Sequence, residues 1–158
     1  MKKLTALLLA VLLVFGLAAC AGSPAEPNAK PGDTMTLQDI LTSITKDVAD
    51  LPDTETTALT KDNFEYFAFT AMPDGVEAIA ADALINAVAH SVVLMRAQDA
   101  ETAKKLAADV EANLNPAKWV CVEAEKTAVL VHNCTVLLVM SWSNVTDALT
   151  ANFNALWS

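Results

Sequence analysis

The first twenty residues decide which part of this chain is left to fold. Lys2 and Lys3 give a positive start, an apolar run follows from Leu4 to Gly16, and small residues stand directly before Cys20. This order is typical of a secretory signal peptide that ends in a lipobox. We therefore expect residues 1–19 to be removed and Cys20 to become a lipid-modified N-terminus. The fold must then be made by the rest of the chain alone.

An ordinary signal peptide and a retained membrane anchor are the alternatives to this interpretation. The apolar run is short for a membrane-spanning helix, which needs about 20 apolar residues. No later stretch of the sequence is long and apolar enough to span a bilayer. The sequence therefore predicts a domain held at the extracytoplasmic face of the cell membrane by acyl chains on Cys20. Two or more such chains bind a bilayer stably where one does not.

Residues 20–35 are predicted to be the lipidated cysteine and a flexible tether. Between Ala21 and Asp33 the chain has three prolines and two glycines and little that could enter a core. Residues 36–158 are then expected to form one domain, a length that can bury a real core.

Three segments of this domain have the apolar spacing of amphipathic helices. Each has a residue type that favours an N-cap directly before it. The predicted caps are Thr36, Asp99 and either Ser143 or Asn144. Pro52 and Pro116 are expected to stop the first two helices.

Several other segments favour strands. The aromatic-rich segment Phe64–Thr70 is predicted to be a strand that leads into a turn at Met72–Gly75. His90–Arg96 is predicted to be a strand buried on both faces. The intervening Val76–Ala89 fits either a helical face or a short strand that bends near Asn86, and its sequence leaves both open.

A hairpin is predicted near the C-terminus. Its strands would be Thr127–His132 and Thr135–Ser141, joined by a tight turn at Asn133–Cys134. The sequence thus predicts the α+β class: a single small domain with a mainly antiparallel sheet and about three helices packed on one face.

Scarce glycine and histidine exclude several kinds of chemistry. Only Gly75 of the four glycines lies in the predicted domain, so phosphate-cradling loops and nucleophile elbows cannot be built. The histidines are His90 and His132, and neither belongs to a metal-binding pair. His90 next to Ser91 could suggest a base and a nucleophile. Neighbours on a strand point to opposite faces, however, so these side chains are not expected to meet.

The charge of the chain also limits its partners. The formal net charge is −9, and removal of the two lysines of the signal would make the remainder still more acidic. Nucleic-acid binding needs a basic footprint, so no nucleic-acid partner is expected. Attraction to an anionic lipid surface is not expected either.

Two cysteines remain once Cys20 carries lipid. A disulfide between Cys121 and Cys134 is possible in an oxidising compartment, and two thiols acting as small hydrophobic groups explain the residues equally well. With His132 they could offer three soft metal ligands. Structural zinc sites normally have four ligands, and no C-x-x-C pair is present. No metal or cofactor is therefore predicted.

One segment resembles a known family. Asn115–Glu125, with the strand Ala89–Arg96 before it and Leu137–Ser141 after it, resembles a family of small Gram-positive lipoproteins that carry a domain of unknown function. The most specific part of the resemblance is the stretch from Lys118 to Glu123. The resemblance covers about residues 36–157 and implies an extracytoplasmic, membrane-anchored domain with no established activity. It singles out Lys118, Trp119 and Glu123 as a candidate binding surface. It also leads us to expect a glycine where this chain has its Asn133–Cys134 turn.

Taken together, these features predict a non-enzymatic binding module of the cell envelope that takes another envelope protein or a small ligand. The segment from Asn115 to Glu125 is the expected contact. Two alternatives stay open. One is a cell-surface hydrolase that uses paired carboxylates, which would need at least one acid of raised pKa. The other is a thiol-based redox or metal-sensing domain that uses Cys121 and Cys134.

Overall fold

The computed structural model describes residues 29–158. The predicted signal peptide, the lipidation of Cys20 and the first part of the predicted tether lie outside the described residues. In the described part of the chain, no helix has the length and apolar character to cross a membrane.

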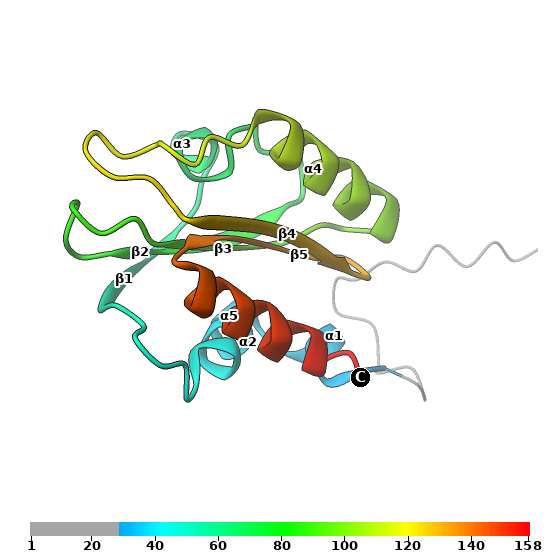
Figure 1. Cartoon of the computed structure of the whole chain (residues 1–158). Helices are drawn as coiled ribbons and strands as arrows, with labels where there is room; N and C mark the ends of the chain where they lie inside the picture. The colour runs from blue at the N-terminus through cyan, green and yellow to red at the C-terminus, as the bar shows by residue number, and fades with distance from the viewer. Residues whose placement is uncertain (1–28) are drawn as a thin grey trace, which may run out of the picture.

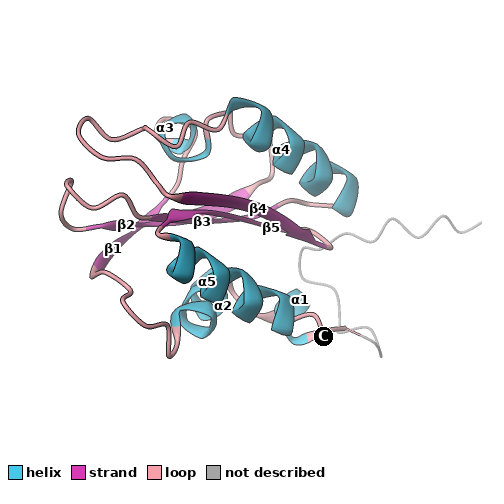
Figure 2. Ribbon diagram, in the orientation of Figure 1, coloured by secondary structure: helices cyan, strands magenta, loops and turns pink. Residues whose placement is uncertain are grey.

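A five-stranded antiparallel sheet forms the middle of the domain (Figures 1 and 2). Its strands, in chain order, are β1 (Thr54–Ala58), β2 (Glu77–Ala83), β3 (Ser91–Arg96), β4 (Lys126–His132) and β5 (Thr135–Ser141). Their order across the sheet is β1-β2-β3-β5-β4. The strands β3 and β5 are therefore central, and they are almost completely buried. The predicted hairpin is confirmed, as is the strand buried on both faces.

Helices cover both faces of this sheet (Figure 1). On one face lie α3 (Phe64–Ala68) and α4 (Ala100–Asn113), and on the other lie α1 (Pro31–Thr34), α2 (Leu37–Thr45) and α5 (Ser143–Ala155). The predicted single α+β domain with an antiparallel sheet is confirmed. The expectation that the helices pack on one face is wrong, because the apolar side chains of β3 and β5 point to both faces and both need cover.

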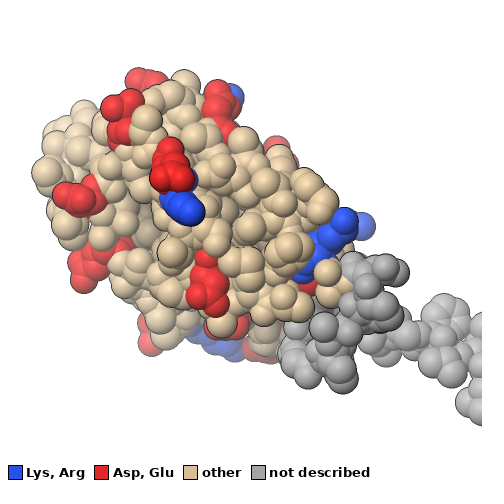
Figure 3. All heavy atoms as spheres, turned by 90° about the horizontal axis from the view of Figure 1, so that it is seen from below, with Lys and Arg blue, Asp and Glu red and all other residues tan. Residues whose placement is uncertain are grey.

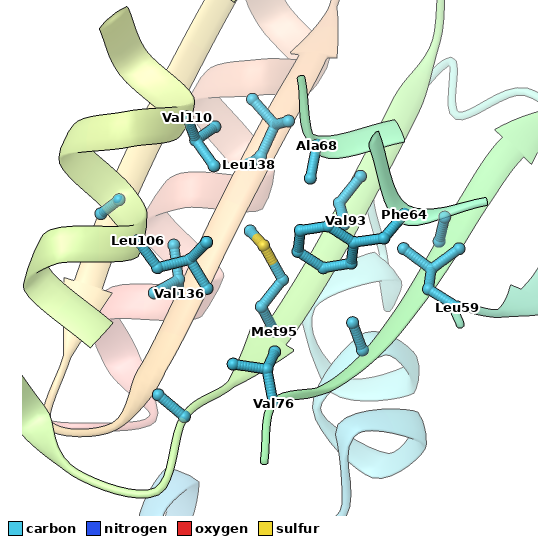
Figure 4. Close-up of a cluster of buried hydrophobic side chains, with 14 of the residues drawn as sticks. Leu59, Phe64, Ala68, Val76, Val93, Met95, Leu106, Val110, Val136 and Leu138 are labelled. Atoms are coloured by element: carbon cyan, nitrogen blue, oxygen red, sulfur yellow. The ribbon is translucent and has the colours of Figure 1, made fainter. Parts of the chain in front are cut away.

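The sheet therefore separates two hydrophobic clusters. Val93 and Met95 of β3 join the cluster beneath α3 and α4, which Figure 4 shows in close-up with Phe64 and Leu106. Val92 and Leu94, which alternate with them, join the cluster beneath α2 and α5. This alternation along one strand is the two-residue period of β-structure.

The predicted helix caps are largely confirmed. Thr36 Oγ1 accepts a hydrogen bond from the backbone N–H of Asp39 at 3.1 Å, and Asp99 Oδ1 accepts one from that of Thr102 at 2.7 Å. The last helix differs slightly, because Trp142 occupies its N-cap position. There the carboxylate of Glu125 accepts the hydrogen bond of the Ser143 N–H at 3.0 Å, so another element supplies the cap.

Two expectations for the middle of the chain need correction. Phe64–Thr70 is not a strand, since Phe64–Ala68 forms the short helix α3. Phe64 and Ala68 stand four residues apart and are both fully buried, which suits a helix packed on the core. Within Val76–Ala89 the strand alternative is right, and the helical alternative is wrong. The polar strand β1 was not predicted at all.

The folded domain also begins earlier than expected. The tether was predicted to run to residue 35, but Gly32 is buried and its N–H donates to the carbonyl of Leu156 at 3.0 Å. The guanidinium of Arg96 donates to the carbonyls of Gly32 and Met35, at 3.1 and 2.7 Å. A Cβ on Gly32 would meet the ring of Trp157, so glycine allows this close approach. The segment from Pro31 onward belongs to the domain.

In the turn between β4 and β5, Asn133 takes the place of the glycine that the family resemblance led us to expect. Asn133 has a φ of 48°, the left-handed conformation that glycine adopts most readily. Asparagine tolerates this conformation better than other side chains. The chain therefore keeps the turn without the glycine that the family resemblance led us to expect.

Candidate functional site

Three polar side chains meet at one end of the sheet, and we call them the clasp: Asp82, Ser91 and Lys118. Asp82 of β2 and Ser91 of β3 stand directly opposite each other in the strand register. Lys118 arrives from the loop between α4 and β4. Its Nζ lies 3.0 Å from Asp82 Oδ2 and 3.1 Å from Ser91 Oγ. The hydroxyl of Ser91 donates to Asp82 Oδ1 at 2.5 Å.

Aromatic rings surround the ammonium group of the clasp. The Nζ of Lys118 lies 5.2 Å from the ring centroids of Tyr66 and Phe67 and 5.0 Å from that of Trp119. Such cation–π contacts strengthen when water is excluded, and the Lys118 side chain is only 4% exposed. Burial lowers the pKa of Lys118, and the charge and hydrogen bond of Asp82 oppose that effect.

This arrangement suits a fixed ion pair better than a reactive centre. The Ser91 hydroxyl is fully buried, with a carboxylate on one side and an ammonium group on the other. A substrate would have to displace those partners to reach it. The clasp instead connects the 114–125 loop to β2 and β3 and fixes its position.

His90 lies on the other face of the sheet from the clasp. Its Nδ1 is 2.8 Å from Ser141 Oγ, and its Nε2 is buried without a partner. Burial, the largest effect, lowers the pKa of His90 to about 4. The prediction that the side chains of His90 and Ser91 do not meet is confirmed, because each binds a different set of partners.

The three residues of the predicted binding surface have different environments. Lys118 points inward to the clasp and is not a surface residue. Trp119 is half-buried and packs against the cluster beneath α3 and α4, whereas Glu123 is exposed. Trp142 and Trp157 pack against the other cluster.

Exposed apolar side chains lie around the clasp. Tyr66 is 62% exposed, Leu84 61%, Ile85 65% and Val120 fully exposed, and we call these four residues the apolar tip. Tyr66 contacts Lys118 directly, Leu84 follows Asp82 by two residues, and Val120 follows Lys118 by two. Figure 1 shows the loops after β2 and α4 projecting at the same end of the domain, away from α1 and the C-terminus.

Sequence reasoning missed most of the apolar tip. Leu84 and Ile85 fell in the segment for which helix and strand were both open, so their exposure could not be inferred. Asp82 and Ser91 were missed as partners of Lys118 because that contact joins residues far apart in the sequence. The sequence does carry one signal for this exposed surface, which is the pair Leu84 and Ile85 directly after the alanine-rich strand β2.

The cysteines do not form the suggested bridge. Cys121 is an exposed free thiol in the loop before β4, and Cys134 is buried in the turn after β4. The whole of that seven-residue strand separates them. The bridge hypothesis is therefore wrong for this structure. Within residues 29–158, no three His, Cys, Asp or Glu side chains gather as a metal site would require.

A general acid needs a carboxyl group of raised pKa, but three carboxyl groups of the domain have a lowered pKa. Hydrogen bonding from Lys61 lowers the pKa of Asp74, and the Thr102 N–H lowers that of Asp99. Burial raises the pKa of Asp33, but hydrogen bonds from Asn133 and Trp157 outweigh it and the net shift is downward. These shifts favour the ionised form.

A second candidate surface lies on the opposite side of the described domain. A hollow between α2 and α5 has Lys46, Asp47 and Asn152 in its lining. The Nδ2 amide group of Asn152 already donates to the carbonyls of Ile44 and Lys46, at 2.8 and 3.4 Å, so its two N–H groups serve the fold. Figure 3, which views the molecule from below, shows acidic side chains scattered over this face, some of them beside Lys or Arg.

Comparison with known proteins finds no family model, no curated protein and no solved structure that matches this chain. Fold and site together define a small α+β sandwich whose apolar tip is held by a buried Lys–Asp clasp.

Proposed function

We propose that this chain is an extracytoplasmic lipoprotein, anchored through acyl chains on Cys20, whose domain binds another cell-envelope protein without catalysis. The observation that supports the binding role most directly is the apolar tip. Single exposed apolar residues are common on protein surfaces, but several around one feature are typical of an interaction site. The family resemblance supports the proposed location, since it also implies an extracytoplasmic, membrane-anchored domain.

The place of the tip in the domain supports the same role. The described chain begins near α1, at the end of the sheet opposite to the apolar tip (Figure 1). A domain anchored through residues before α1 would therefore present its tip away from the bilayer. A partner in the envelope could reach it there.

The clasp would give this surface a fixed shape. Lys118 holds the 114–125 loop on the sheet while Val120 projects from it. A loop that is already ordered loses less conformational entropy on binding than a mobile one. The half-buried Trp119 contributes to the same support, so we expect the tip and its base to act together.

Cross-linking in native membranes, followed by mass spectrometry, tests this proposal. The variant Leu84→Ser/Ile85→Ser removes apolar surface without touching the core, and Asn86→Ser/Ala87→Ser changes exposed neighbours in the same loop as a control. We expect the first variant to reduce recovery of a stoichiometric partner about tenfold, the effect of losing a central interface contact. The control should leave recovery unchanged. Equal recovery from both variants would remove the tip as the site.

Membrane fractionation tests the lipid anchor separately from the binding site. A Cys20→Ser variant should leave the membrane fraction, because the acyl chains would have no attachment point. Retention of that variant in the membrane after a high-salt wash would contradict lipid anchoring. It would leave the binding result at the tip standing.

A further inference from the structure

The two edges of the sheet differ in how well they are protected. The edge strand β1 is short and polar, and it presents exposed Glu55 and Thr56. Polar and charged side chains on a short strand discourage pairing with another sheet. The other edge, β4, has seven residues and carries no charge between Lys126 and His132.

The β4 edge is long, regular and apolar. All seven of its residues pair with β5 in one unbroken register, without a bulge. Its side chains after Lys126 are half-buried beneath α4 and α5, with Val129 and Val131 on one face and Leu130 on the other. No other strand within residues 29–158 pairs with its outer side. Natural proteins rarely leave such an edge uncovered, because its free N–H and C=O groups are a template for another strand.

We propose that β4 pairs with β4 of a second copy of this chain, antiparallel and about a two-fold axis at Val129. The two sheets would then continue into each other through backbone hydrogen bonds. This is an isologous contact, in which the same strand serves both partners. It uses a surface separate from the apolar tip and does not depend on the function proposed above.

The side chains of β4 suit this register. Antiparallel pairing about Val129 places Ala128 opposite Leu130 and Thr127 opposite Val131 of the other copy, so small side chains face larger ones. It also places Lys126 opposite His132. The two Lys126 side chains, the only formal charges of the strand at pH 7 with histidine neutral, would stand at opposite ends of the contact. No like charges would lie directly opposite each other, which would otherwise be destabilising.

The groups at the strand ends also have local partners. The Nζ of Lys126 lies 2.5 Å from Asp147 Oδ1 in α5. The ring of His132 stacks on that of Trp157 at 5.0 Å, and its Nε2 is 2.7 Å from Asn154 Oδ1. These contacts hold both side chains against α5 on their own molecule. The second copy would therefore meet mainly backbone and short apolar side chains along β4.

Thiol trapping tests the register. In a Cys121→Ser background, which removes the exposed native thiol, Val129→Cys places each new thiol next to its own counterpart. We expect a disulfide-linked dimer on mild oxidation, seen on a non-reducing gel of the full chain in its membrane. Thr127→Cys alone should not cross-link, because its counterpart would lie four residues away. Mixing Thr127→Cys with Val131→Cys should restore the dimer.

Sedimentation measures the association without a new cysteine. The purified protein should sediment as a dimer, and Thr127→Lys should reduce it to a monomer because a lysine on an edge strand blocks pairing. Thr56→Lys on β1 is the matched control and should stay dimeric. Circular dichroism confirms that each variant is folded.

Three results would overturn the proposal. One is a folded wild-type protein that stays monomeric at about 1 mM, the weak end of specific association. Another is equal dimer trapping by Val129→Cys and by Thr127→Cys, which would mean random collision. The last is trapping of Val129→Cys to a different protein, which would assign the edge to another partner.

Discussion

His90 combines complete burial with an incomplete set of hydrogen bonds. Its side chain is 1% exposed and its Nε2 has no partner, while Nδ1 contacts Ser141. Burial disfavours the charged imidazolium, so the pKa of His90 falls from 6.5 to about 4. The folded protein therefore keeps this residue neutral over a pH range in which the unfolded chain would protonate it.

This difference makes the free energy of unfolding depend on pH. Above pH 6.5 His90 is neutral in both states and its contribution is constant. As the pH falls from 6.5 towards 4, only the unfolded chain gains the proton, so stability is lost. We expect a loss of about 3 kcal/mol across this range, measured by urea unfolding.

His90→Gln is the comparison that isolates this residue. The variant should be less stable at pH 7.5, and its free energy of unfolding should change much less between pH 7.5 and 4.5. The carboxyl groups with lowered pKa values, such as Asp99, titrate below this window in the folded protein. An equal pH slope in wild type and variant would show that His90 does not control the effect.

Lys118 stabilises the structure through its partners in the clasp. Lys118→Met would leave Asp82 without its counter-ion, although Asp82 is 24% exposed and can still reach water. We therefore expect a cost of about 2 kcal/mol in the free energy of unfolding, below the 3–5 kcal/mol typical of a fully buried pair. The amide of Ala124, bonded to the carbonyl of Pro116 at 2.9 Å, should exchange with deuterium faster as the loop loosens.

A double variant separates the charge from the packing. Lys118→Met/Asp82→Asn removes both charges, so it should recover part of the stability lost by Lys118→Met alone. If the double variant is less stable by the sum of the two single effects, the ion pair does not couple these residues.

At the scale of single elements, local signals predicted most of this fold. Thr36 and Asp99 marked two helix starts because a short polar side chain can bind a free N–H at a helix start. The hairpin followed from two β-rich runs around a two-residue turn. These features depend on neighbours in the sequence, which is why sequence reasoning finds them.

Elements that depend on distant partners were harder to predict. Phe64–Ala68 has the composition of a strand, yet Phe64 and Ala68 are buried together in a helix against the core. The polar strand β1 forms because β2 offers it a backbone partner, and its own side chains give little signal. For the same reason, only part of the candidate site could be predicted from the sequence. Lys118 and Trp119 came from a local motif, whereas Asp82 and Ser91 depend on the sheet.

At the scale of the whole molecule, the sheet divides the core into two clusters that share its central strands. Leu106 of α4 is buried in one cluster and Leu149 of α5 in the other. Each Leu→Ala change removes buried methyl groups and leaves a cavity, so each should cost about 2–5 kcal/mol. The two sites share no cluster, so we expect the costs to add within about 0.5 kcal/mol in Leu106→Ala/Leu149→Ala.

Denaturant unfolding of the four proteins measures this. We also expect one cooperative transition for each, because β3 and β5 contribute side chains to both clusters. Two separate transitions in either single variant would mean that the layers unfold independently.

The contact between α1 and the C-terminal residues has a consequence for the connectivity of the chain. The N–H of Gly32 donates to the carbonyl of Leu156, and the indole of Trp157 donates to Asp33, so the two ends of the described domain lie together. A short linker from Ser158 back to Ala29 would close the polypeptide into a ring without crossing the sheet. The chain could then be reopened in the exposed loop after β2, which would move both termini to the far end of the domain while every strand kept its neighbours.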